Sequence, residues 1–301
     1  MKRLVTALVL LAIFAEGTYL AYKAAQLYIY RAVFAGSYTY NLLFTSSSWL
    51  LPIAIFLGIY VGATVKRRES ELTDGKVLRH DETAFLIHWS HALSTLVLIG
   101  TGIYLGFFFF PRLVHSPEQV GFVLNLHFVG VVVFLFSISL HLTDMYVTGK
   151  IKEHLPEPGD FQDAIAHYVS KLGIGRKPKE GKYLASEKLS YPMWIVSVGL
   201  VLITGFIKVA AHRWSIPGGV MGAVTWLHDL GALLVGINLV VHIIMSSVMP
   251  WSWPLLRSML TGYVSEEYVR KHHAKWYEEL ANQPLKEAES TGKETQIPVS
   301  S

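Results

Sequence analysis

Cysteine is absent from this sequence. Without a thiol, the chain cannot hold an iron–sulfur cluster, attach a c-type haem covalently, form a disulfide or bind zinc through thiolates. Any metal or haem in the protein would therefore have to be held by its 13 histidines.

Charged residues are also scarce. They make up 16% of the chain, whereas hydrophobic residues make up 52%. Soluble domains usually contain about 25% charged residues, and disordered chains are rich in charge and poor in apolar residues. The composition excludes both classes. The formal net charge is +4, and an excess of Lys and Arg is typical of the cytoplasmic loops of membrane proteins. No polar segment is large enough to bind nucleic acid, so we expect no nucleic-acid partner.

Six stretches are apolar and close to the roughly 20 residues that a membrane-spanning helix needs. They are 4–22, 47–65, 84–110, 123–147, 190–212 and 222–249, of which the last four are the strongest. The sequence thus predicts an all-α integral membrane bundle, with a four-helix core plus one or two extra N-terminal transmembrane helices. The first stretch begins with Lys2 and Arg3 and has a short apolar run, a pattern typical of a signal peptide or of a retained anchor.

Lysine and arginine are distributed unevenly between the two sides of the predicted bundle. Most of them fall before the first stretch, between 66 and 79, in the loop 148–189 and after residue 256. The positive-inside rule makes these segments cytoplasmic, and with them the C-terminus. We divide the chain into an N-terminal membrane part (1–70), a four-helix core with its cytoplasmic loop (71–260), and a cytoplasmic C-terminal helix with a flexible tail (261–301).

Six histidines lie within the four strongest spans: His88, His91, His127, His141, His228 and His242. Ionisable side chains inside a membrane are costly and usually functional. His228 and His242 are 14 residues apart, which puts both on one helix face within roughly 40° and about 21 Å apart along the axis. His127 and His141 repeat the interval. Two rows of histidines, one near each membrane face, suit two b-type haems that are held axially by imidazole pairs.

The outer row pairs His127 with His228, because each lies about one turn inside the outer end of its helix. The inner row pairs His242 with either His88 or His141. Depth in the membrane does not decide between these two. The repeated interval of 14 residues favours His141, an arrangement seen in the cytochrome b of quinol–cytochrome c reductases.

Glycines follow both outer histidines at the same distance. Gly130 comes three residues after His127, and Gly231 three residues after His228. Glycine exposes backbone that a porphyrin can approach closely. We therefore predict that these two glycines line a haem pocket. Further bare helix surface comes from Gly100, Gly102 and Gly236.

Several short motifs stand before, within or after the core helices. They are Ile87-His88-Trp89, Leu126-His127, Gly181-Lys182-Tyr183 with Glu187-Lys188, His228 with His242, Gly262-Tyr263-Val264-Ser265, Lys271-His272-His273 and Lys275-Trp276-Tyr277. With these motifs, residues 79–280 resemble the cytochrome b (gamma) subunit of membrane-bound formate dehydrogenase. One departure is Leu184, where that family has Asn after Lys-Tyr.

The resemblance implies a set of haem ligands. It pairs His88 with His242 at the inner haem and His127 with His228 at the outer haem, which leaves His141 for the quinone site. It also implies two haem b groups, a quinone acceptor such as menaquinone, and a bacterial or archaeal cytoplasmic membrane. The implied partners are an iron–sulfur subunit and a catalytic subunit that contains molybdenum or tungsten.

Polar residues near the inner face form a candidate quinone and proton site. Asp144 lies one helical turn after His141. We expect it near Lys182 and Glu187, which belong with Ser186 to the segment that opens the third core helix. A carboxylate beside an imidazole can deliver protons to a reduced quinone.

These observations predict a membrane-anchoring dihaem subunit that passes electrons from an iron–sulfur partner across the membrane to a quinone. The alternative within the same class is the cytochrome b subunit of a hydrogenase or a thiosulfate reductase. A haem-free transporter or a passive membrane anchor is a further alternative. Transporters are typically built from internal repeats with broken helices at mid-membrane, and neither role would explain the histidines.

Overall fold

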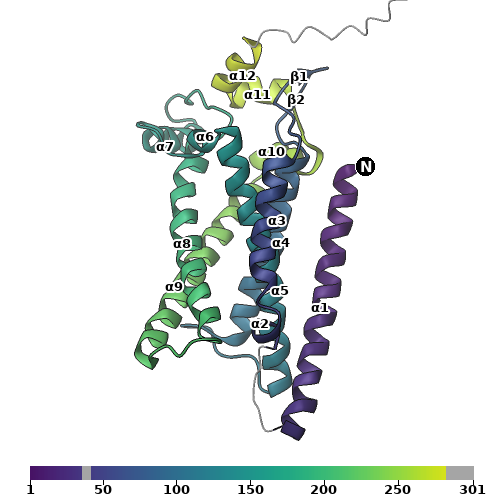
Figure 1. The fold of residues 1–301 in the computed structure, drawn as a ribbon. Coiled ribbons are helices and arrows are strands. Elements are labelled where there is room, and N and C mark those ends of the chain that lie inside the picture. The colour runs from purple at the N-terminus through teal and green to yellow at the C-terminus, as the bar shows by residue number, and fades with distance from the viewer. Residues whose placement is uncertain (36–41, 283–301) are drawn as a thin grey trace, which may run out of the picture.

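The computed structural model describes residues 1–35 and 42–282, and long helices run side by side below a cap of short elements (Figure 1). Among these residues, five helices are long and apolar enough to cross a membrane. They are α1 (Lys2–Ala35), α4 (Glu82–Leu105), α5 (Pro117–Thr148), α8 (Ala185–Ala210) and α9 (Gly218–Ile243), which the π-helical turn η1 (Ile244–Val248) continues. The predicted all-α membrane bundle is confirmed, with its four strongest spans at the expected places.

The second predicted span is shorter than expected. Residues 47–65 contain helix α3 (Leu50–Thr64), which follows the short helix α2 (Leu42–Ser46). Fifteen helical residues extend about 22 Å, which is less than the roughly 30 Å of hydrocarbon in a bilayer. α3 is therefore an apolar helix of the bundle that falls short of the length for a full span.

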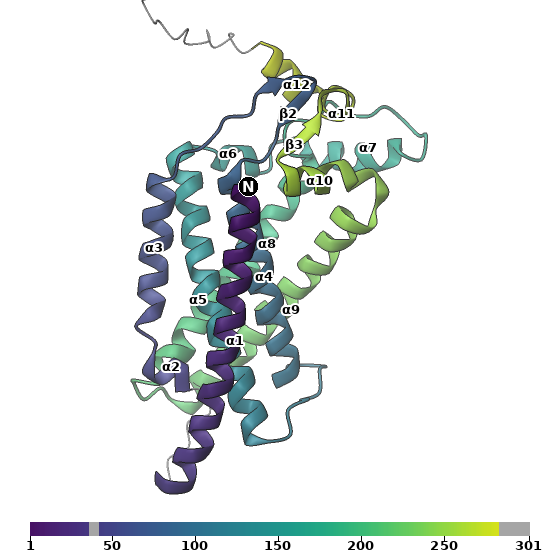
Figure 2. The same ribbon diagram turned by 90° about the vertical axis from the view of Figure 1, so that its right-hand side faces the viewer.

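α5 is the central helix. α1, α3 and α4 pack along it, and α1 lies on the outside against α5 and α4 (Figure 2). α8 and α9 pack on each other as a second hairpin, on the side opposite to α1 (Figure 1). Buried Phe128 and Leu135 of α5 form one cluster with Phe44 and Leu51, against which Leu202 of α8 packs. The core of the bundle thus follows α5.

Local sequence signals explain where the core helices begin. The Asp81 side chain accepts a hydrogen bond from the backbone N–H of Ala84 at 2.8 Å and caps α4. Ser116 caps α5 in the same way, and Pro117 occupies its first position. Asp and Ser at the N-cap satisfy free N–H groups, and Pro at the first position has no N–H to satisfy. The two helices that carry His88 and His127 are therefore fixed at their starts.

The cap contains a small sheet that the all-α prediction did not include. Its strands are β1 (Leu72–Thr73), β2 (Lys76–Leu78) and β3 (Tyr263–Ser265), antiparallel in the order β1-β2-β3. Asp74 and Gly75 turn the β1–β2 hairpin with positive φ angles, as an Asp-Gly pair favours. The helices of the cap are α6 (Ile151–His154), α7 (Asp160–Ser170), η2 (Pro250–Ser252), α10 (Trp253–Thr261), α11 (Glu266–His272) and α12 (Ala274–Ala281).

The first turn of α1 is bonded to the cap. The Arg3 guanidinium donates to the backbone carbonyls of Met259 at 3.2 Å and Leu260 at 3.3 Å, and also to that of His80. Gly262 leaves room for this side chain, because a Cβ there would lie 2.6 Å from Arg3 Nη2. The start of α1, the segment before α4 and the end of α10 thus meet at one point.

The basic segments that the sequence assigns to one side of the membrane lie together at the cap end (Figure 1). They are the first turn of α1, the β1–β2 hairpin, the connection from α5 to α8, and α10 to α12. Most of the predicted flexible tail, residues 283–301, lies outside the described residues.

We expect the contact between α3 and α5 to be sensitive to a single methyl group. A Cβ at Gly58 would collide with the backbone carbonyl of Phe136 and lie 2.9 Å from the Cβ of Ser139. Gly58→Ala should therefore destabilise the bundle by about 1–3 kcal/mol through overpacking. The control is Gly222→Ala on α9, where an added Cβ meets nothing within 4 Å. It should be neutral or stabilise the helix by up to about 1 kcal/mol. Unfolding equilibria in detergent test this, and equal effects of the two substitutions would contradict it.

Candidate functional site

The structure brings together two histidines of the inner row. His88 on α4 and His242 at the end of α9 have ring centroids 6.2 Å apart, with ring planes at 49°. A bond from a metal ion to a histidine nitrogen is about 2.0 Å long, so imidazoles on opposite sides of one ion have centroids about 6 Å apart. The spacing fits a haem iron between the two rings. His88 Nδ1 is buried and has no hydrogen-bond partner.

His141, the alternative inner ligand, faces other groups. Its Nε2 lies 3.1 Å from the hydroxyl of Tyr191 on α8, and its ring centroid is 5.8 Å from that of His91. The Tyr191 hydroxyl also donates to the sulfur of Met145. The structure therefore brings the ring of His88 next to that of His242, whereas His141 contacts Tyr191 and His91.

Each histidine of the outer row is bonded to a threonine on the neighbouring helix of its own hairpin. His127 Nδ1 on α5 lies 2.7 Å from the hydroxyl of Thr101 on α4. His228 Nδ1 on α9 lies 2.9 Å from the hydroxyl of Thr204 on α8. The sequence analysis missed both threonines. Their only signal in the sequence is that each precedes its histidine by a similar number of residues, 26 and 24.

The predicted role of two glycines is wrong. A Cβ at Gly130 would lie 3.1 Å from Leu98 of α4, and a Cβ at Gly231 would lie 2.7 Å from Val201 of α8. Both glycines therefore allow two helices of one hairpin to approach closely, as small residues commonly do in membranes. By contrast, an added Cβ meets nothing within 4 Å among the described residues at Gly100, Gly102 and Gly236.

Asp144 has an ion-pair partner that the sequence analysis did not consider. Its carboxylate forms an ion pair with Arg67, which follows α3. Arg67 also donates to the backbone carbonyls of Val65 and Gly62. Asp144 thus ties the end of α5 to the end of α3.

The other three candidate residues before and within the start of α8 have separate partners. Lys182 Nζ donates to Ser70 Oγ at 3.2 Å. Ser186 Oγ accepts from the hydroxyl of Tyr168 at 3.1 Å, and Glu187 accepts from the backbone N–H of Leu184 at 2.9 Å. Ser186 and Glu187 therefore serve the start of α8, whereas Lys182 bonds to the segment between α3 and β1.

A cluster of cations and aromatic rings surrounds Lys182. Its ammonium and the guanidinium of Arg79 lie over the same two rings, those of Tyr183 and Trp276, each at 5.7–5.9 Å. Burial, together with the charges of Lys150 and Arg79, lowers the pKa of Lys182 to about 8. Burial raises the pKa of Tyr183. This inner cation cluster offers protonated nitrogens next to the membrane span.

Two buried donors, one on Arg79 of the inner cation cluster and one on Trp89 of α4, have no acceptor among the described residues. Arg79 is 5% exposed, and its Nη1 is buried without a hydrogen-bond partner. Its Nη2 lies 3.7 Å from Glu187. The indole N–H of Trp89 is likewise buried without a partner. A buried donor without an acceptor is costly, so these groups favour a ligand that brings acceptor oxygens.

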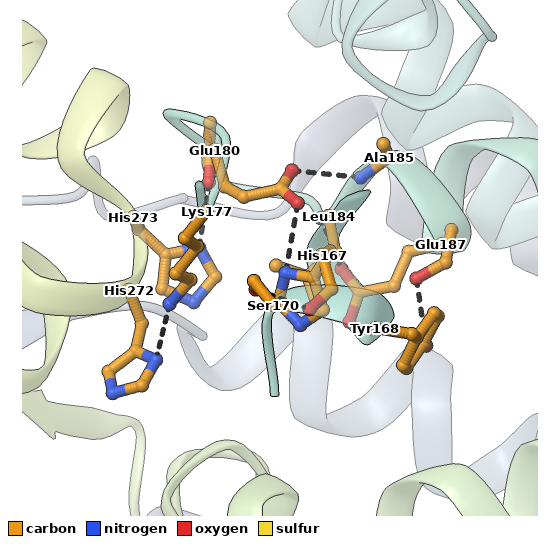
Figure 3. Close-up of polar contacts among 12 residues, drawn as sticks. His167, Tyr168, Ser170, Lys177, Glu180, Leu184, Ala185, Glu187, His272 and His273 are labelled. Atoms are coloured by element: carbon orange, nitrogen blue, oxygen red, sulfur yellow. Dashed lines mark hydrogen bonds and ion pairs between the residues drawn. The ribbon is translucent and has the colours of Figure 1, made fainter. Parts of the chain in front are cut away.

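The loop that carries Lys182 is held by a buried carboxylate (Figure 3). Glu180 Oε1 lies 3.1 Å from His167 Nδ1 of α7, and its Oε2 accepts from the backbone N–H of Ala185 at 3.0 Å. The carbonyl of Gly181 accepts from Nδ1 of His273 at 2.7 Å. The loop is thus held in place by contacts from α7, α8 and the α11–α12 junction. The Gly181-Lys182-Tyr183 motif pointed to this loop in the sequence but did not show what holds it.

A row of rings connects the inner site with the surface of the cap. The His141 centroid lies 6.5 Å from that of His154 of α6, which lies 4.3 Å from the ring of Tyr183 and 5.4 Å from that of Tyr191. Imidazole and phenol groups both donate and accept protons. His154 and Tyr191 had not been singled out in the sequence, because only their proximity in the fold relates them to His141.

Taken together, these features define a helical membrane protein whose facing histidines are spaced for haem, as in membrane cytochromes b. The chain belongs to the prokaryotic cytochrome b561 family, whose sequence model matches residues 79–262. The match includes α4, α5, α8 and α9, and it begins after α1 and α3. Membership of this family implies haem b as the cofactor and electron transfer in a membrane as the activity.

Individual relatives match a similar part of the chain. The cytochrome b556 subunit of formate dehydrogenase from Haemophilus influenzae is 28% identical over 224 residues, which cover 71% of this chain and 87% of the relative. The cytochrome b556(fdo) subunit of formate dehydrogenase from Escherichia coli is 25% identical over 235 residues, which cover 75% and 100%. The nitrate-inducible cytochrome b556(Fdn) subunit from the same species is 22% identical over 213 residues, which cover 68% and 92%.

The stability of the cap should decrease in acid. Burial, followed by the charge of Arg79, lowers the pKa of His273 to about 3, and burial with Arg79 and Lys182 nearby lowers that of His80 to about 2. In the unfolded chain both rings titrate near 6.5. Protons therefore bind preferentially to the unfolded chain below pH 6.5. Above pH 6.5 the two neutral rings contribute their full stabilisation to the cap. Below it, the free energy of unfolding of the cap falls by about 1.4 kcal/mol per pH unit for each ring, until the pH approaches the pKa of that ring in the folded protein.

Hydrogen exchange of the α11 and α12 amides between pH 7 and pH 5, corrected for intrinsic exchange rates, measures this decrease. The His273→Gln variant should show a smaller dependence on pH. The control is His115→Gln, which removes an exposed histidine outside the cap and should leave the dependence unchanged. A cap whose protection is the same at both pH values would contradict the prediction.

Proposed function

We propose that this chain is the cytochrome b subunit of a membrane-bound formate dehydrogenase, and that it carries electrons across the membrane to a quinone. The observation that carries the proposal is the spacing of His88 and His242, 6.2 Å between ring centroids. Helix α9, which carries His242, also carries His228 of the outer pair. The printed names of the relatives support formate as the substrate of the complex.

α9 supplies one ligand to each of two haems. His228 and His242 lie 14 residues apart on it, or about 21 Å along the axis. His127 of α5 completes the outer pair and His88 of α4 completes the inner pair. Haem b, when bound at these sites, supplies one-electron redox chemistry. Helices α4, α5 and α9 would hold the four imidazole rings that bind the two groups.

The electrons must come from another subunit. The chain has no cysteine and so offers no cluster of its own at the far end of the bundle, where the outer pair lies. An iron–sulfur subunit docked at that end would deliver electrons to it. A catalytic subunit with molybdenum or tungsten would oxidise formate beyond it, as the family resemblance implies.

The quinone would bind at the cap end, beside the inner cation cluster. Reduction of a quinone to a quinol requires two electrons and two protons, so its carbonyl oxygens need donors. Lys182 Nζ, Arg79 Nη1 and the indole N–H of Trp89 are donors of this kind. Lys182 is protonated at neutral pH, because its pKa is about 8, and it can release a proton readily.

Protons would reach this site from the cap side. His141, Tyr191 and His154 form the row of rings that leads from the bundle to the cap, and each can accept and release a proton. The positive-inside rule supports a cytoplasmic cap. With formate oxidised on the opposite side, uptake of protons at the cap would generate a membrane potential.

The experiment that tests the proposal is purification of the complex from its native membrane. A pyridine haemochrome assay should give two b-type haems per chain, and a formate-oxidising catalytic subunit with an iron–sulfur subunit should copurify. One haem or none would contradict the dihaem proposal. A hydrogenase or a thiosulfate reductase as the copurifying enzyme would contradict the assignment to formate.

Two substitutions separate the candidate inner ligands. His88→Ala should reduce the haem content from two to one and abolish quinone reduction, while formate still reduces the outer haem, because the inner iron loses one of its two axial nitrogens. His141→Ala should keep both haems and slow quinone reduction. Reduced-minus-oxidised spectra measure both effects. The opposite pattern, in which only His141→Ala loses a haem, would favour the helix-repeat pairing instead.

Lys182 should set the pH dependence of quinone reduction. Its acid form is lost as the pH rises through about 8, so the wild-type rate should fall above that pH. Lys182→Gln should lower the rate at neutral pH by about 100-fold or more and remove this dependence, with the haem spectra unchanged. Lys179→Gln is the matched control, since that side chain is in the same loop and 71% exposed. Equal rates for the two variants would exclude Lys182 as a proton donor.

A further inference from the structure

The hydrogen bonds of Thr101 and Thr204 fix the protonation of the outer histidines. Thr101 Oγ1 lies 2.7 Å from the carbonyl of Val97, 3.0 Å from that of Leu98 and 2.7 Å from His127 Nδ1. A hydroxyl has one proton, and a carbonyl can only accept. The Thr101 proton is therefore donated to its own helix, and the hydroxyl oxygen accepts from an N–H at His127 Nδ1.

Thr204 repeats this arrangement in the other hairpin. Its Oγ1 lies 2.6 Å from the carbonyl of Leu200 and 2.9 Å from His228 Nδ1. The carbonyl of Val201 is a second acceptor beside the His228 ring. Nδ1 is therefore the protonated nitrogen in both outer histidines. Their Nε2 atoms carry the free lone pairs.

We propose that Thr101 and Thr204 are positioning residues for the outer haem, an inference that rests on the proposed function of His127 and His228 as its ligands. Each hydroxyl holds its imidazole in the tautomer that binds iron through Nε2 and fixes the rotation of the ring. Hydrogen bonds from the second nitrogen of a ligating histidine also increase the basicity of the ligand. A more basic ligand stabilises oxidised iron, so both bonds lower the reduction potential of the outer haem.

The inner row differs from the outer row in this respect. Among the described residues, His88 Nδ1 is buried without a hydrogen-bond partner, so this ligand receives no corresponding increase in basicity. This difference by itself lowers the potential of the outer haem relative to that of the inner haem. Such a difference favours electron movement from the far end of the bundle toward the cap, which is the direction of the proposed function.

The experiment is a redox titration of the purified complex, followed by visible absorption, on four variants. Thr101→Val keeps the shape of the side chain and removes the acceptor, whereas Thr101→Ser keeps the acceptor. Thr204→Val removes the second hydroxyl. Thr143→Val is the matched control, because that hydroxyl donates to the carbonyl of Ser139 within α5.

We expect Thr101→Val to raise the potential of the outer haem, leave that of the inner haem unchanged, and weaken retention of the outer haem by about 10–100-fold. Thr101→Ser should restore the wild-type potential, and Thr143→Val should not change it. Thr204→Val should have the same effect as Thr101→Val but a smaller one, since the Val201 carbonyl remains as an acceptor. Selective loss of the outer haem in Thr101→Val, with recovery in Thr101→Ser, would also support the proposal.

Wild-type potentials for both haems in Thr101→Val, with both haems retained, would overturn the proposal. So would an equal shift in Thr143→Val, or a shift that Thr101→Ser fails to reverse. A failure of the proposed function would give different results. If the ligand assignment itself were wrong, the wild-type complex would hold fewer than two haems, or a His127→Ala variant would keep its outer haem.

Discussion

An imidazole inside a membrane has two nitrogens and no water to bind either of them. One nitrogen needs an acceptor for its proton, and the other needs a group that uses its lone pair. The bundle meets the first need at the outer histidines with threonine hydroxyl groups of the neighbouring helix. The second nitrogen of each ring then remains for the family's cofactor.

The same requirement explains the pairing of helices. Gly130 lets α5 approach α4, and Gly231 lets α9 approach α8. Only helices this close can bring a threonine hydroxyl within hydrogen-bonding distance of a histidine on the next helix. The glycines thus contribute to the haem site indirectly. They set the distance between two helices, and that distance sets the chemistry of the ligand.

Much of the fold follows from features that a sequence displays directly. Long apolar runs predicted the spanning helices, because bilayer thickness dictates their length. Histidines at intervals of 14 residues predicted two rows, because helical periodicity is fixed. The Arg67–Asp144 ion pair, by contrast, joins residues 77 positions apart, and no periodicity relates them. α3 was overestimated because hydropathy alone does not indicate where a helix ends.

The candidate site was predictable to a similar degree. Residues that stand out by type, such as the histidines and Lys182, were found. Arg79 and Trp276 were not assigned a role, since their importance lies in surrounding Lys182 from separate parts of the chain. Thr101 and Thr204 were missed because threonine is common in membrane helices. Only the distance to a histidine distinguishes these two from the rest.

The contacts of Arg3 affect the order in which the chain can complete its fold. Its acceptors are the carbonyls of His80, Met259 and Leu260, and the last two are synthesised after all the long helices have emerged. During translation the Arg3 guanidinium can therefore bind the His80 carbonyl early, whereas its bonds to Met259 and Leu260 form only after α10 has been made. Those two bonds mark a chain whose long helices have all been synthesised. A chain that stops before α10 would lack them and would differ from a finished chain at the start of α1.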